Sequence, residues 1–191
     1  RSSVGHTRTT GREGGTCVDL IELANMQKQL DSFIAKEKGL GDPYNKKFLE
    51  SRILALKVEI AELANATRCF KYWSNKGPES KERILDEAAD VLHFILSIIN
   101  LENTETFKLE KTNNMISKDL DIKKESDYTV LREKLIIQFN LLFKYAEKEK
   151  WLIVIVELAY SILMMGFTLE ELQEAYLKKH KENYRRQEQG Y

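Results

Sequence analysis

The sequence predicts an all-α protein, a helical bundle with about six main helices, and three observations lead to this prediction. Long segments rich in Leu, Ala, Glu and Lys, which are good helix formers, run between short breaks. Those breaks contain the only two prolines, Pro43 and Pro78, each close to a glycine. No segment alternates apolar and polar residues as a half-buried strand does, and no internal repeat is visible.

The first two helices are bounded by strong stop signals. The first is expected from about residue 18 to 38, because the segment 39–43, Gly-Leu-Gly-Asp-Pro, follows it. The second is expected from about residue 46 to 73, and it ends before the segment 75–78, Asn-Lys-Gly-Pro.

The third and fourth helices flank a polar segment. The third is expected to start near residue 79 or 80, with Ser80 as its N-cap, and to run to about residue 99. Residues 100–128 turn polar, so we expect a loop or excursion with little core of its own. A fourth helix is expected over residues 129–148.

The last two helices follow closely. A fifth is expected over residues 151–165, and Gly166 ends it. The apolar run 151–167 is short for a membrane span, which favours a buried core helix. Thr168 then opens Thr-Leu-Glu-Glu, the pattern of a capping box, so a sixth helix is expected to continue to about residue 186.

Composition limits the classes of function. The 191 residues carry 30 Lys+Arg and 30 Asp+Glu, and this zero net charge argues against a binder of nucleic-acid polymers. Residues 1–16 are expected to form a flexible or cloning-derived leader, and residues 17–191 a single domain. The only cysteines, Cys17 and Cys69, exclude a disulfide scaffold and fit a cytoplasmic protein. No targeting or membrane segment stands out.

Two pairs of acidic residues stand out on consecutive predicted helices. Glu59 and Glu62 form one pair, and Glu87 and Asp90 form the other. The i, i+3 spacing puts both acids of a pair on one helix face, with Cβ atoms ~5–6 Å apart. Their neighbours are largely apolar, and only Glu87 has a cation one turn away, at Arg83. Like charges on such a face repel each other and lose hydration, a cost that a divalent cation would remove.

The residues alone leave three explanations for these acids open. They could be ordinary surface acids. They could hold Mg²⁺ or Mn²⁺, because four carboxylates on two antiparallel helices are hard oxygen ligands. They could belong to a di-iron site, but such a site needs Glu-x-x-His on two helices, and only Asp90 and His93 have that spacing. His93 is better explained as a histidine at the edge of the core or behind the metal ligands.

Three segments in order resemble the dimeric all-α dUTPase family, which belongs to the wider MazG-like nucleotide pyrophosphohydrolases. Residues 59–94, EIAELANATRCFKYWSNKGPESKERILDEAADVLHF, carry the family's ExxE, interval and ExxD. Residues 26–34, MQKQLDSFI, resemble its Gln-x-x-Leu-Asp segment. Residues 176–191, YLKKHKENYRRQEQGY, resemble its C-terminal pattern. The resemblance implies a hydrolase whose metal ligands and catalytic residues are the four acids Glu59, Glu62, Glu87 and Asp90.

The same resemblance implies residues that bind the nucleoside. Gln27 offers a carboxamide that suits the O4 and N3–H edge of uracil, and Asp31 could bond the 3′-hydroxyl or basic neighbours. Trp73 and Phe94 are candidates for stacking on a pyrimidine ring, although aromatic residues at helical spacing are usually core.

Further residues are implied at the phosphates. Lys179, Asn183 and Arg186 lie on one helical stripe, where the two cations could hold phosphate oxygens and Asn183 could contact base or sugar. A solvated basic face is the alternative, and the resemblance to the family's C-terminal pattern favours binding. The same resemblance implies that Tyr191 also binds the substrate. Lys76, in the turn before the third helix, is either another phosphate ligand or an ordinary loop lysine.

The predicted reaction is hydrolysis of dUTP to dUMP and pyrophosphate, which limits the incorporation of uracil into DNA, with dUDP as a second substrate. Two or more Mg²⁺ ions would neutralise the phosphates, and Glu62 would orient or deprotonate the attacking water. The family resemblance also implies a homodimer with both active sites near the interface. The alternatives are a related pyrophosphohydrolase for another nucleotide such as dCTP, and a catalytically silent helical module that binds protein partners.

Overall fold

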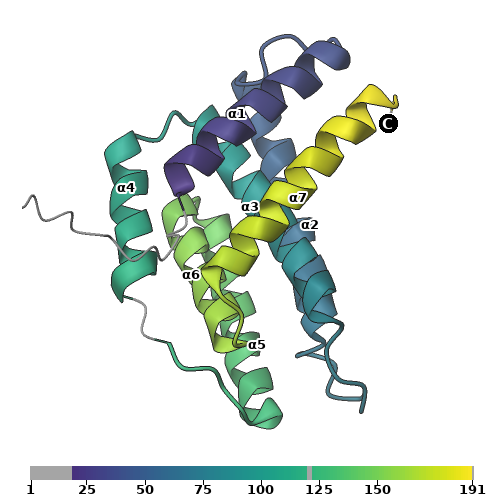
Figure 1. Cartoon of the computed structure of the whole chain (residues 1–191), viewed down its shortest axis with the longest axis vertical. Coiled ribbons are helices and arrows are strands. Elements are labelled where there is room, and N and C mark those ends of the chain that lie inside the picture. Colours follow the sequence, from purple (N-terminus) through teal and green to yellow (C-terminus); the bar gives the residue numbers. More distant parts are fainter. Residues whose placement is uncertain (1–18, 120–121, 191) are drawn as a thin grey trace, which may run out of the picture.

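The computed structural model describes residues 19–119 and 122–190, and within them it contains seven α-helices and no strand (Figure 1). The predicted all-α bundle is therefore confirmed. The helices are α1 (Leu20–Glu37), α2 (Leu49–Thr67), α3 (Lys81–Leu101), α4 (Thr106–Asn114), α5 (Tyr128–Glu147), α6 (Trp151–Met164) and α7 (Leu169–Glu188). A 3₁₀ turn, η1 (Lys46–Phe48), precedes α2, and a π turn, η2 (Met115–Asp119), follows α4.

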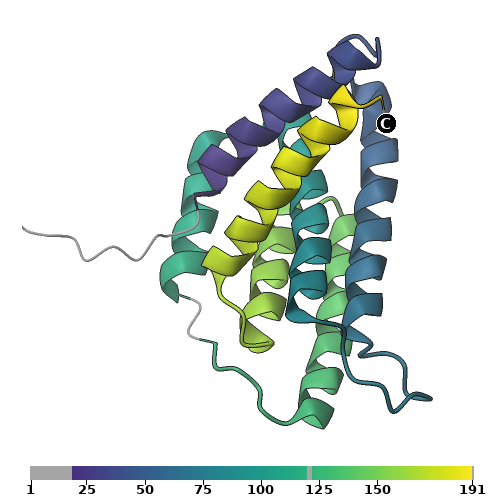
Figure 2. The same ribbon diagram turned by 45° about the vertical axis from the view of Figure 1, so that its right-hand side comes forward.

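Helix α3 is the centre of the molecule. It packs against α1, α2, α6 and α7, and most of its side chains are buried. Helices α1 and α7, from opposite ends of the chain, lie side by side across it (Figure 2). Helices α5 and α6 pack against each other as a hairpin. Consequently α1, α2, α3 and α7 meet around one core, and they contain all of the predicted site residues except Trp73, Lys76 and Tyr191.

Several predicted helix ends are confirmed by their capping hydrogen bonds. Ser80 caps α3, because its side chain accepts a hydrogen bond from the backbone N–H of Arg83. Thr168 and Glu171 form the predicted capping box at the start of α7. Gly166 follows α6 with φ +81°, a conformation that a side chain would strain.

The predicted end of the second helix is wrong. Helix α2 stops at Thr67, six residues before Trp73, because Arg68 adopts a left-handed conformation with φ 56°. The chain then turns back on itself, and the Glu79 N–H donates to the Ala66 carbonyl oxygen at 2.9 Å. Trp73 therefore lies in the loop 68–80 and not on a helix.

The prediction of a coreless loop over residues 100–128 is wrong in part. Helix α4 forms there and buries Leu109, and Ile116 in the following turn is also buried. The Leu20 N–H at the start of α1 donates to the Asn113 side chain at 3.1 Å, which fixes α4 against α1. Two buried apolar residues seven positions apart are too sparse to reveal the helix among so many polar neighbours.

Helix α6 is the buried core helix that its apolar sequence predicts. Among the described residues, no helix on its own has the length and apolar character needed to span a membrane. Helices α6 and α7 meet these two conditions of length and composition only when they are taken together, as a pair bent by 113°. The predicted leader 1–16 and Cys17 fall outside the described residues, so the predicted domain start at residue 17 stays a prediction, while Cys69 is buried as a free thiol.

Candidate active site

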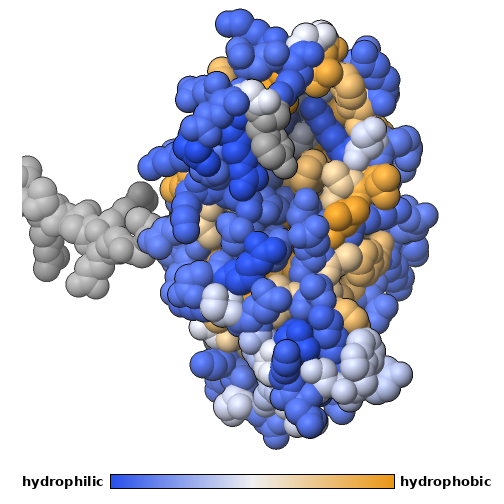
Figure 3. All heavy atoms as spheres, turned by 90° about the vertical axis from the view of Figure 1, so that its right-hand side faces the viewer, coloured by the Kyte–Doolittle hydropathy of each residue, from blue (hydrophilic) through white to orange (hydrophobic). Residues whose placement is uncertain are grey.

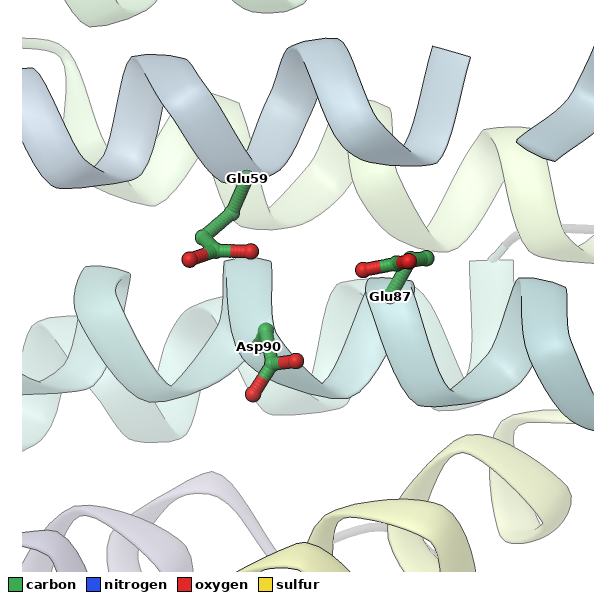
Figure 4. Close-up of side chains that lie close together, drawn as sticks. All are labelled: Glu59, Glu87 and Asp90. Carbon is green, nitrogen blue, oxygen red and sulfur yellow. The ribbon is translucent and has the colours of Figure 1, made fainter. Parts of the chain in front are cut away.

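Three of the four predicted acids converge between α2 and α3. Glu59 of α2 and Glu87 and Asp90 of α3 each place a carboxylate oxygen within 4.8 Å of the others. Figure 4 shows Glu59 and Glu87 reaching into the space between the two helices, with Asp90 beside them. We call these three residues the acidic cluster.

Local packing explains why these carboxylates meet. Helix α2 buries Leu56, Ile60 and Leu63 completely against the core, so Glu59 lies at the edge of that buried face. Ala88 and Ala89 of α3 are also fully buried, and their small side chains let the two helices approach closely. The acids therefore stand at the rim of an apolar interface.

Burial and mutual repulsion disfavour the charged forms of the acidic cluster. The pKa of Glu59 is raised to about 7 by burial first and then by the charges of Asp90, Glu62 and Glu87. Burial likewise raises the pKa of Glu87 and the pKa of Asp90 from their ordinary values. Such a cluster attracts cations, because a positive charge relieves both costs.

Two basic side chains already provide part of that positive charge. Arg83 pairs with Glu87, as its sequence position one turn away predicts. The Lys179 ammonium lies 2.6 Å from Asp90 and 2.8 Å from Asp86. Asp86 is thus a further acid at this site that was not among the predicted site residues, and its position one turn before Asp90 was the signal that could have revealed it.

The fourth predicted acid, Glu62, stands apart. It is exposed and is not one of the three residues of the acidic cluster, although its charge acts on both Glu59 and Glu87. Its carboxylate is therefore accessible to water at the edge of the cluster.

A buried polar network lies behind the acidic cluster. Gln27 is buried, and its Nε2 donates to Asp31 at 2.8 Å while its Oε1 accepts from His93 Nδ1 at 2.6 Å. The carboxylate can only accept, so it fixes the orientation of the Gln27 amide, and the amide oxygen in turn fixes the proton on His93 Nδ1. Burial lowers the pKa of His93 to about 3, which keeps its ring neutral. Ser97 completes the network by donating to Asp31 at 2.7 Å.

A cavity of about 250 Å³ opens beside this network. Phe94, one turn after Asp90, is half-buried in its wall, and Asp31 and Ser97 contribute polar groups. The lining residues are Asp31, Ile34, Ala35, Leu40, Pro43, Phe48, Ser51, Arg52, Phe94 and Ser97. An apolar hollow with an aromatic wall and a few convergent polar groups is a suitable site for a small planar ligand.

A family model described as dUTPase matches residues 19–191, which is almost the whole chain. The chain belongs to the all-α dUTPase family. It is therefore a hydrolase of nucleotide metabolism with dUTP diphosphatase activity. The family generally requires a divalent metal and is generally oligomeric. The comparison with curated proteins found no match.

Helix α7 of this dUTPase carries three residues predicted to bind the substrate, and the three have different neighbours. Lys179 faces the acids of α3, as described above. Asn183 is half-buried one turn further along α7, and Arg186 lies 3.1 Å from Glu182. Tyr191 falls outside the described residues. Of the predicted stripe, Lys179 contacts Asp90 of the acidic cluster directly, and the charge of Arg186 also acts on Asp90.

The remaining residues predicted to bind the nucleotide do not lie together in this dUTPase. Trp73 is 65% exposed in the loop 68–80, where its ring contacts Tyr72 and Phe70 edge to face, and Lys76 is exposed in the same loop. Neither residue lines the cavity. Gln27 is buried, with both ends of its amide bonded within the chain.

Among the residues of the cavity that sequence reasoning missed, Arg52 and Ser97 are polar and hydrogen-bonded within the site. Arg52 stands seven residues before Glu59, and Ser97 seven residues after Asp90. Two helical turns separate each pair, so each missed residue shares a helix face with a predicted acid. That spacing was the signal that could have identified them.

Proposed function

We propose that this dUTPase hydrolyses dUTP to dUMP and pyrophosphate in a Mg²⁺-dependent reaction, with Glu59, Glu62, Glu87 and Asp90 as the metal ligands. The convergence of the acidic cluster is the observation that supports this proposal most directly. Its donors are carboxylate oxygens, which suit Mg²⁺ and also Mn²⁺. The raised pKa of Glu59 fits the same conclusion, because a cation would favour its charged form.

The proposed roles of the chain's own residues follow from their exposure and charge. Bound Mg²⁺, in two or more copies, supplies positive charge and lowers the pKa of water. Glu62, the exposed acid, orients the attacking water and accepts its proton. Lys179 and Arg186 offset the charge of the leaving phosphates. We propose dUDP as a second substrate, because the same contacts serve a shorter phosphate chain.

We propose that the cavity between α1, α2 and α3 holds the nucleoside. Phe94 offers a ring face for stacking, and it stands one helical turn, ~6 Å, from Asp90. A base in the cavity therefore leaves its phosphates within reach of the acidic cluster. Asp31, in the same wall, supplies a charged acceptor for a polar edge of the nucleoside.

We further propose that the enzyme is a homodimer joined through α2 and α5. Leu54 and Val58 are exposed on α2, and Ala61 continues the same stripe to a second groove of about 250 Å³. That groove is lined by Ala61, Ala64, Cys69, Phe70, Ile136, Phe139, Asn140 and Phe143. Figure 3 shows apolar side chains gathered between polar regions on the face that forms the right-hand side of Figure 1. Because Glu62 is one turn from Val58, this interface would lie close to both active sites.

The test is the release of pyrophosphate from dUTP, dCTP, dTTP and dATP, with Mg²⁺ and with a chelator. We expect rapid release from dUTP that requires the metal. Absence of metal-dependent release from every nucleotide would contradict the proposal. Faster release from dCTP than from dUTP would instead establish the alternative substrate. The cytoplasmic location stays a prediction from the sequence.

A further inference from the structure

Arg52 is the charged residue of the cavity to which no role has been assigned. It lies on the same face of α2 as Glu59, while Phe94 and Ser97 lie on the face of α3 that carries Asp90. The cavity is thus a continuation of the space that holds the acidic cluster. A base in this cavity meets the guanidinium of Arg52 on one wall.

Arg52 and Asp31 form an incompletely satisfied pair. Their side chains are only 14% and 8% exposed, and Arg52 Nη2 lies 3.9 Å from Asp31 Oδ2, which is too far for a hydrogen bond. Each Asp31 oxygen accepts one hydrogen bond, from Gln27 or from Ser97, and retains capacity for another. A strong donor and a strong acceptor therefore stand next to each other in the wall of the cavity.

The remaining contacts of Arg52 leave donors available. Its Nη1 donates to the Ser97 carbonyl oxygen at 3.2 Å, and its Nη2 donates to the Pro43 carbonyl oxygen at 2.7 Å. Within the described part of the chain these bonds use two of the five N–H donors of a guanidinium. They also hold the group in place, because one bond reaches α3 and the other reaches the segment after α1. A donor fixed in this way is preorganised for a ligand.

The arrangement of one donor beside one acceptor matches one pyrimidine edge. Uracil and thymine present the O4 acceptor next to the N3–H donor, whereas cytosine presents an N4 amino donor next to the N3 acceptor. We propose that Arg52 determines specificity for the uracil edge, donating to O4 while Asp31 accepts from N3–H. With cytosine, the N4 amino donor would face the donor Arg52, and the N3 acceptor would face the carboxylate of Asp31. Binding would be weaker, because these buried polar groups would stay unpaired. This inference rests on the proposed nucleoside site, and it assigns Asp31 to the base in place of the 3′-hydroxyl.

The experiment compares the wild-type enzyme with Arg52→Gln. The readouts are kcat/KM for dUTP and dCTP, and the affinities of dUMP, dTMP and dCMP measured by calorimetry. Thymine shares the hydrogen-bonding edge of uracil, so the ratio of dUMP to dTMP affinity serves as an internal control for the shape of the cavity. Arg132→Gln is the matched variant, because Arg132 also donates to a backbone carbonyl oxygen, that of Cys69, but belongs to α5 and does not line the cavity.

We expect Arg52→Gln to lower the preference for dUTP over dCTP by about tenfold or more, with the same change in the dUMP to dCMP ratio. The dUMP to dTMP ratio should stay within about twofold of wild type, since the two bases offer Arg52 the same groups. Arg132→Gln should change neither ratio.

An unchanged dUTP to dCTP preference in Arg52→Gln would overturn the assignment of Arg52. An equal shift of both monophosphate ratios would also overturn it, because that result indicates collapse of the cavity and not loss of edge recognition. These failures differ from failure of the proposed function, in which the wild-type enzyme itself shows no metal-dependent hydrolysis of dUTP.

Discussion

At the scale of single residues, the candidate active site holds more carboxylates than the basic side chains beside them can neutralise. Glu59 has no Lys or Arg one turn away on its own helix, and its pKa of about 7 reflects burial together with three neighbouring carboxylates. Lys179 reaches across from α7 to Asp90, so the basic helix and the acidic helices are joined by charge. The same lysine was predicted from the sequence as a phosphate ligand, and a side chain already held at the acidic cluster is well placed for that role.

Glu62 gives the most direct test of the proposed mechanism. Glu62→Gln keeps the size of the side chain but removes its charge and its ability to accept a proton. We expect kcat for dUTP to fall about 100-fold or more, the usual range for loss of a general base. Glu50→Gln, which changes another exposed glutamate of the same helix, should leave kcat unchanged. Wild-type turnover by Glu62→Gln would remove Glu62 from the roles of base and metal ligand.

His93 predicts how stability depends on pH. Burial lowers its pKa from 6.5 to about 3 in the folded chain, so between these values the unfolded chain binds the proton more readily. Its contribution to stability is full above pH 6.5 and is lost as the pH falls toward 3, with a slope of up to ~1.4 kcal/mol per pH unit. Denaturant unfolding of wild type and His93→Gln between pH 4 and 8 checks this. The variant should lose less stability on acidification, and parallel curves would contradict the assignment.

The sequence revealed the acids of the site, but it did not reveal that Gln27 is buried or that Arg52 lines a cavity. The i, i+3 spacing of Glu87 and Asp90 is a local property, so their shared face followed from helix geometry alone. The burial of Gln27 behind His93 depends on how α1 packs on α3, which no local pattern encodes. Arg52 was missed for the same reason, because its importance comes from a cavity that three helices form together.

At the scale of helices, capping residues at the helix N-termini predicted correctly where helices begin. Sparse apolar patterns did not reveal every helix. The capping box at Thr168 and the cap at Ser80 are local hydrogen bonds and were predicted correctly. The end of α2 was misplaced because Arg68 adopts a left-handed conformation that usually requires glycine or asparagine. Tertiary bonds, including that from Glu79 to Ala66, accompany this early stop.

The capping box offers a test of how α7 is held. Thr168→Ala removes the side chain that accepts from the Glu171 N–H, so one orphan donor at the helix start loses its partner. We expect the free energy of unfolding to fall by about 1 kcal/mol. Thr129→Ala, an exposed threonine in the first turn of α5 next to the cap Asp127, should have little effect. Equal stability of both variants, measured by denaturant unfolding, would show that the cap contributes nothing.

At the scale of the whole molecule, the zero net charge is a sum of unlike regions. Acids gather where α2 faces α3, and bases gather on α7, where Lys178, Lys181 and Arg185 are exposed. Because α7 packs on α3, the two regions adjoin, and Lys179 and Asp90 join them directly. A small polyanion with a bound divalent cation matches this arrangement, since it presents both signs of charge within one ligand.

The proposed dimer face gives the prediction for the whole molecule. Leu54→Glu places a charge on an α2 side chain that is 64% exposed, so the monomer should fold normally while the dimer is weakened by the burial of that charge. Phe107→Glu is the matched control, because Phe107 is 61% exposed on α4, outside the proposed interface. Sedimentation analysis should show wild type and Phe107→Glu as dimers and Leu54→Glu with a dissociation constant raised at least ~10-fold, a loss of ~1.4 kcal/mol. A fully dimeric Leu54→Glu, or a Phe107→Glu that is equally monomeric, would place the interface elsewhere.

Since Glu62 borders the proposed face, we also expect the kcat of Leu54→Glu to recover as the protein concentration rises. A defect confined to one subunit would not produce this dependence on concentration.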